Sequence, residues 1–308
     1  MNRRSIVAAL AVAAAVAAGA AAVALHYLRP AQLVAAVAGK LKQSTGRELV
    51  VTGATGIKLF PRPAIVLEDV RFGNAAWASQ PWMATVGRAE AEMQWGPLLR
   101  GEIDIASIHL AGAALLLETD AAGNGNWAMG APDSAPIDLS WLAGFAVAEL
   151  RIEPFAVAYR DGATGNTTRV ALETVTLEAP PAPQPIRFQT HGRYSGKRFE
   201  AQGSIGALAA LLAGDRPYPL TLSATSGNSK LEISGEAGQP SQLAGLSLDV
   251  SAHGAALADL EVLFPRALGP WLAEHDREGH LPGLAYSLGW HLAGNWNAFS
   301  LSGMNIVV

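Results

Sequence analysis

The sequence of 308 residues contains no cysteine, which excludes disulfides, thiolate metal sites and cysteine nucleophiles. Charged residues are also scarce, at 16% of the chain, and the formal net charge is -4. Such a balance gives no sign of a basic surface that would attract a polyanion. Nucleic acid is therefore not expected as a partner.

Motifs of the common enzyme classes are missing as well. The sequence has no Gly-x-Ser-x-Gly motif and no P-loop, and Gly53-Ala54-Thr55-Gly56 lacks the context of a dinucleotide-binding turn. The densest polar cluster, His275 to His280, is interrupted by Gly279 and followed by Pro282, which favours a solvated loop over a metal or acid–base site. We predict that the protein is not an enzyme and has no catalytic residue, metal site or cofactor.

Charge is absent from one long stretch near the N-terminus. The 24 residues from Ser5 to Leu28 contain no Asp, Glu, Lys or Arg. As a helix they would extend about 36 Å, enough to cross a hydrocarbon core of about 30 Å. Because Arg3 and Arg4 precede the segment, the positive-inside rule places the N-terminus in the cytoplasm and the body across the membrane.

A cleaved signal peptide is the alternative to this transmembrane anchor. Small residues such as Ala20-Ala21-Ala22 offer cleavage sites. The apolar run is longer than the usual hydrophobic region of a signal peptide, which favours the anchor. In both cases the remainder of the chain is exported.

Beyond the apolar segment, the chain divides into a short helix and a long series of strands. Residues 31–44 place Leu33, Val34, Val37 and Leu41 at helical spacing, which predicts an amphipathic helix that either caps the first strands or contacts lipid headgroups. We expect an anchor at 1–29, this helix at 30–46 and a β domain at 47–308. Proline-rich stretches near 132–136 and 179–185 are candidate boundaries within that domain.

Apolar and polar residues alternate in the strands of the C-terminal half. This period of two is typical of an antiparallel sheet with one apolar face and one polar face. The apolar positions that we expect on one face are Leu220, Leu222, Leu246, Leu248, Val250, Leu284, Tyr286, Leu288 and Trp290.

Several different short motifs follow one another in a characteristic order along the chain. They are Thr45-Gly46-Arg47, Leu59-Phe60-Pro61-Arg62-Pro63, Trp95-Gly96-Pro97-Leu98-Leu99-Arg100-Gly101, Gly123-Asn124-Gly125-Asn126-Trp127, Val157-Ala158-Tyr159-Arg160-Asp161 and Gly203-Ser204-Ile205-Gly206. Together with the N-terminal apolar segment, they resemble the N-terminal portion of the AsmA family, the bacterial relatives of the repeating-β-groove (chorein-like) lipid transfer proteins.

The resemblance implies a mainly β fold: an N-terminal transmembrane helix, then an elongated, curled antiparallel sheet of groove or taco shape with a few short helices. It also implies a single-pass protein of the bacterial inner membrane with a periplasmic body. The apolar face would hold the acyl chains of phospholipid, and the protein would serve outer-membrane biogenesis by binding or transferring lipid.

Another role is compatible with the same sequence. The sheet could instead be filled by its own side chains, and the protein could act as a scaffold that regulates protein targeting to, or assembly in, the outer membrane. Its partners would then be other envelope proteins. Residues 300–308 resemble one more strand with an open edge, so we expect either that the chain is part of a longer architecture or that this edge pairs with a partner.

Overall fold

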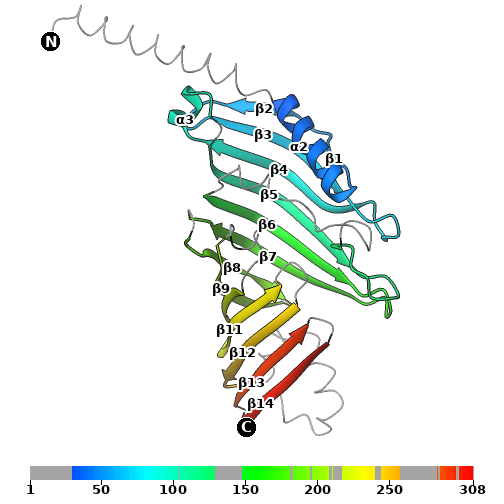
Figure 1. The fold of residues 1–308 in the computed structure, drawn as a ribbon, viewed down its shortest axis with the longest axis vertical. Coiled ribbons are helices and arrows are strands. Elements are labelled where there is room, and N and C mark those ends of the chain that lie inside the picture. Colours follow the sequence, from blue (N-terminus) through cyan, green and yellow to red (C-terminus); the bar gives the residue numbers. More distant parts are fainter. Residues whose placement is uncertain are drawn as a thin grey trace, which may run out of the picture. The chain divides into compact units, whose positions relative to one another are not determined.

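A computed structural model describes residues 30–102, 104–128, 148–180, 183–194, 196–207, 210, 217–239, 244–256, 283, 285–295 and 298–307. The chain forms two compact units. Unit 1 comprises Met1–Ala148 and Arg160–Asn166, and unit 2 comprises Glu149–Tyr159 and Thr167–Val308. The strands of both units appear in Figure 1.

Unit 1 is an antiparallel sheet with a helix along one edge. The strand order is β1-β3-β4-β5. Strand β2 pairs with the first part of β3, on the same edge on which β1 pairs with its last part. Helix α2 packs on β1 and β2. The elements are α2 (Pro30–Thr45), β1 (Leu49–Val51), β2 (Thr55–Lys58), β3 (Ala64–Gly73), β4 (Trp82–Met93), α3 (Trp95–Leu99) and β5 (Ile105–Glu118).

A line of irregular residues crosses three strands of this sheet. Asp69, Gly87 and Gly112 occupy corresponding positions on β3, β4 and β5, between register pairs that are regular on both sides. Asp69 has φ 51° and Gly112 has φ 65°, values that interrupt an extended strand. Because the irregular positions are aligned, the strands bend together, and Figure 1 shows β3 and β4 curving along their length.

In unit 2, the strands β6 to β14 are consecutive neighbours in one sheet. The registers described from β7 onward are antiparallel. A two-residue turn joins β10 to β11, and Gly227 supplies the positive φ of 56° that such a turn requires. The strands are β6 (Glu149–Arg160), β7 (Thr167–Glu178), β8 (Ile186–Tyr194), β9 (Lys197–Ile205), β10 (Tyr218–Ser226), β11 (Ser229–Gln239), β12 (Ala244–Gly254), β13 (Tyr286–Asn295) and β14 (Ala298–Val307).

The observed elements confirm a mainly β protein with antiparallel strands and few helices. The β-branched and large apolar residues from Thr85 to Trp95 predict a strand, but β4 ends at Met93 and Trp95–Leu99 form α3, so this prediction is wrong at its C-terminal end. Met93 and Leu98 pack together there as a buried pair, and burial of both side chains favours the helical turn. Among the helices that the structure describes, none is long and apolar enough to cross a membrane. Residues 5–28, with Arg3 and Arg4, lie outside the described part, as does the boundary predicted near 132–136.

Candidate functional site

The sheet of unit 2 has one apolar face, and the candidate residues lie on it. In β10, Leu220 and Leu222 are partly buried, whereas Thr221 between them is exposed. In β12, Leu246 and Val250 are buried, Leu248 is half-buried like Ser247 before it, and Asp249 is exposed. Successive side chains of a strand point to opposite faces, so the predicted alternation is present in the folded sheet. Leu284 lies outside the described residues.

Cross-strand register joins these positions into rows that run perpendicular to the strands. Leu222 pairs with Ile233, Ile233 with Val250, and Val250 with Trp290. Seven strands with a spacing of about 4.8 Å carry this row over about 29 Å. We call the face that carries it the apolar face. The complete row is Leu177, Phe188, Gly203, Leu222, Ile233, Val250 and Trp290.

Burial divides the apolar face into a covered part and an accessible part. Val250 and Tyr286 are 6% and 4% exposed and belong to a hydrophobic cluster with Ala224, Leu231 and Ala252. Leu246 is also buried, at 8%. The other candidates are half-buried, pack on this cluster or beside it, and are the ones that a ligand can reach: Leu220, Leu222, Leu248, Leu288 and Trp290.

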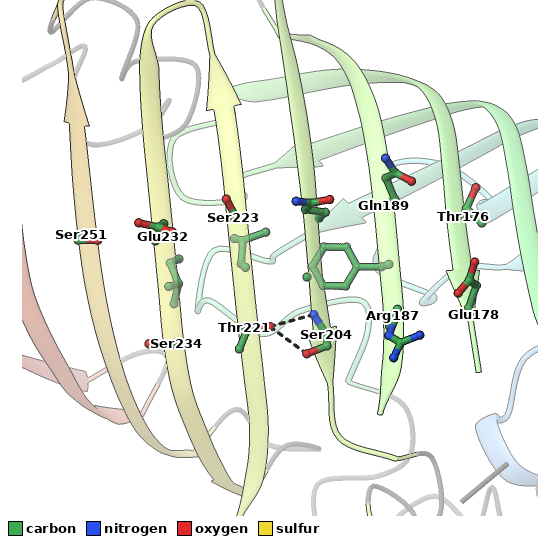
Figure 2. Close-up of a pocket in the computed structure, with 15 residues that line it drawn as sticks. Thr176, Glu178, Arg187, Gln189, Ser204, Thr221, Ser223, Glu232, Ser234 and Ser251 are labelled. Atoms are coloured by element: carbon green, nitrogen blue, oxygen red, sulfur yellow. Dashed lines mark hydrogen bonds between the residues drawn. The ribbon is translucent and has the colours of Figure 1, made fainter. Parts of the chain in front are cut away.

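The opposite face carries a hollow of about 750 Å³. Figure 2 shows polar side chains of successive strands projecting around it. We call it the polar hollow. Its side chains form two rows in register. One row is Thr176, Gln189, Gln202, Ser223, Glu232 and Ser251, and the other is Glu178, Arg187, Ser204, Thr221 and Ser234. Between these rows, Phe188, Gly203, Leu222 and Ile233 of β8 to β11, which belong to the apolar row, also line the hollow.

Polar side chains of the hollow hydrogen-bond to one another and to a neighbouring residue. Ser204 and Thr221 share a hydroxyl–hydroxyl bond of 2.9 Å, which Figure 2 shows as a dashed line. The Lys230 ammonium donates a hydrogen bond of 2.7 Å to the Glu232 carboxylate and holds the pKa of Glu232 below its usual range. Glu232 is thus a stabilised anion at an exposed surface, which is not the state of a general acid.

A second polar arrangement, which the sequence did not reveal, lies in unit 1. The Asn126 side chain is fully buried and makes three hydrogen bonds. Its oxygen accepts the main-chain N–H of Glu118 at 3.0 Å, and its nitrogen donates to the Leu116 carbonyl at 2.8 Å and to Asn74 Oδ1 at 2.9 Å. Asn126 therefore fixes the end of β5 to the loop between β3 and β4.

The Glu118 carboxylate is equally buried and is held from three directions. The main-chain N–H of Ser79 and the amide of Asn74 donate to it at 3.1 and 3.0 Å. The Arg160 guanidinium lies 3.6 Å away. A buried charge needs such partners, because its desolvation is otherwise very costly.

Arg47 connects the same region to helix α2. Its guanidinium donates to the Asn126 carbonyl and lies 3.0 Å from Met83 Sδ. Burial lowers the pKa of Arg47. The hydroxyl of Thr45 accepts the N–H of Arg47 at 3.2 Å and donates to the Leu41 carbonyl at 2.6 Å. We call Arg47, Asn74, Glu118 and Asn126 the Asn126 network.

The network brings together residues from motifs that are far apart in the sequence. Thr45-Gly46-Arg47 and Gly123-Asn124-Gly125-Asn126-Trp127 are far apart in sequence, yet Arg47 and Asn126 are in contact. Arg160 of a third motif reaches Glu118. These residues hold the helix, the sheet and the hairpins of unit 1 together, so we assign them a structural role.

Fold and site together define a mainly β protein whose sheet has one apolar and one polar face. The model of the AsmA family matches residues 2–137. The AsmA family protein YhjG of Escherichia coli (strain K12) is 23% identical over 229 residues, which are 65% of this chain and 32% of that protein. The chain thus spans about a third of the length of this curated relative. Both findings confirm the resemblance to the AsmA family that the sequence predicts.

Proposed function

We propose that the protein is a non-catalytic, lipid-handling protein of the bacterial cell envelope. Residues 5–28 would anchor it in the inner membrane, and the periplasmic sheet would bind or pass phospholipid in support of outer-membrane biogenesis. Membership of the AsmA family and an open antiparallel sheet are compatible with this role.

The observation that carries the proposal is the row of apolar residues in register across β7 to β13. A continuous apolar surface suits an acyl chain because each CH₂ removed from water contributes about 0.8 kcal/mol. The half-buried Leu220, Leu222, Leu248, Leu288 and Trp290 offer such a surface, whereas the buried Val250 and Tyr286 support it from within. No catalytic residue is needed for this kind of binding.

One observation favours a scaffold as the second candidate function. The centre of the apolar face is covered, since Ala252 is 1% and Val250 6% exposed, and the 750 Å³ hollow lies on the polar face. A sheet filled by its own side chains would act through envelope-protein partners and would carry no lipid. The two functions therefore differ in whether phospholipid accompanies the folded protein.

Native mass spectrometry of the full chain, purified in a mild detergent, tests the proposal. We expect adducts with the mass of whole phospholipids, at about one or more per chain, that survive detergent exchange. Lipid-free protein in the same spectra, from preparations with native β-sheet circular dichroism, would overturn the lipid proposal and favour the scaffold.

A further inference from the structure

One end of the strands of unit 1 carries large apolar side chains in water. Phe60, in the loop between β2 and β3, is 63% exposed, and Leu99, at the end of α3, is 50% exposed. The ring of Trp95 lies beside that of Phe60, with centroids 5.9 Å apart. We call Phe60, Trp95 and Leu99 the apolar tip.

The tip is firmly supported. Beneath it, Met93 and Leu98 are 1% and 0% exposed. Ile57, Leu59 and Ile65 pack against this pair. The indole N–H of Trp95 donates to the Pro61 carbonyl at 3.2 Å. The exposed side chains are therefore presented by a packed base, and their exposure is a property of the folded unit.

Charges around the tip are balanced. Arg100 lies 3.0 Å from Glu102, and Arg62 lies 3.7 Å from Glu92. A tip with aromatic and aliphatic side chains, an indole N–H and a rim of paired charges matches the interfacial layer of a bilayer, where amphipathic rings are enriched. Because positive and negative charges cancel, such a tip does not need anionic lipid.

The proposed anchor at residues 5–28 would bring a bilayer close to unit 1. Helix α2 begins at Pro30, two residues beyond the uncharged segment at 5–28, and packs on β1 and β2. Figure 1 shows α3 at the end of the unit-1 strands, in the same part of the unit as β2. With a helix of 16 residues, about 24 Å long, as the connection, unit 1 is held within reach of the membrane surface.

We propose that the apolar tip inserts into the interfacial layer of the bilayer that holds residues 5–28, and so fixes the orientation of unit 1 at the membrane. This inference rests on the anchoring in the proposed function. It adds a second, non-covalent attachment point and identifies its ligand as the surface of a phospholipid bilayer.

The absence of cysteine makes a clean probe experiment possible. An environment-sensitive NBD fluorophore on Glu102→Cys reports on the tip, and the same fluorophore on Ala122→Cys reports on the far end of β5, in the hairpin after that strand. The full chain is reconstituted into phosphatidylcholine vesicles with and without brominated acyl chains. We expect at least twofold quenching at position 102 by brominated lipid and none at 122.

The matched variants separate the tip from exposed apolar residues in general. Phe60→Ser with Leu99→Ser should abolish quenching at 102, whereas Trp77→Ser, which removes a 45% exposed ring beyond the other end of β3, should leave it unchanged. Flotation of the vesicles first shows whether the protein is bound to them. If it is, equal quenching at positions 102 and 122, or no quenching at 102, would overturn the tip proposal and leave the anchor intact. Failure to float would overturn the anchoring and the tip proposal together, without bearing on the apolar face.

Discussion

Replacing Asn126 by alanine is expected to speed amide hydrogen exchange in β5 and in the 119–127 hairpin about a hundredfold. The substitution removes the partner of the buried Glu118 N–H and of the partly buried Leu116 carbonyl, whereas Asn74 Oδ1 keeps the N–H of Ala75. Each unsatisfied buried group costs about 1–3 kcal/mol, so a loss of about 3 kcal/mol is expected. A loss of this size corresponds to about two powers of ten in the opening equilibrium.

The neighbouring Asn124 provides the control within the same hairpin. Asn124 is exposed, and its side chain donates to the Asp120 carboxylate at 2.8 Å. Asn124→Ala should change exchange by less than about threefold, because an exposed hydrogen bond is replaced by water at little cost. Exchange mass spectrometry follows both variants, with β10 to β12 of unit 2 as the internal reference. Equal protection of β5 in Asn126→Ala and the native chain would show that the network does not hold unit 1.

The second large effect concerns lipid. Leu222→Asp combined with Leu248→Asp should remove at least nine-tenths of the phospholipid that accompanies the purified protein. Both leucines are half-buried on the apolar face, and a carboxylate beside an acyl chain would have to be desolvated. Quantitative lipid mass spectrometry of the washed protein measures the loss per chain.

Controls for this variant lie on the same two strands. Thr221→Asp combined with Ser247→Asp adds the same charges one residue away, on the polar face, and should leave lipid content unchanged. The milder pair Leu222→Ser and Leu248→Ser, which keeps charge constant, should show intermediate loss in a folded protein. Full lipid content in a folded Leu222→Asp, Leu248→Asp chain would contradict lipid binding on this face.

Much of the fold follows from local patterns in the sequence. In β10, Leu220 and Leu222 alternate with Thr221, and this period of two fixes both the strand and its faces. Leu33, Val34, Val37 and Leu41 predict the helix that the structure shows as α2. Such signals act between near neighbours in the chain, so one sequence is enough to detect them.

Other features depend on contacts that sequence spacing does not encode. Arg47 and Asn126 are far apart in the chain, and nothing in either motif indicates that they meet in a buried network. The polar hollow likewise arises from the register of β7 to β12, which sets Gln202 between Gln189 and Ser223. The strand predicted over Thr85 to Trp95 extends two residues too far because Trp95 follows Met93 at the strand spacing of two, whereas burial of Leu98 against Met93 favours the helical turn of α3.

The central claim is that lipid contacts the apolar face and not the polar one. The most direct measurement places a photoreactive phenylalanine at position 222 or at position 221, in cells, and detects phospholipid adducts of the full chain after irradiation. The two positions are adjacent in β10 and point to opposite faces. We expect a phospholipid adduct from position 222 and none from position 221. No adduct from 222, or equal yields from both positions, would contradict the claim.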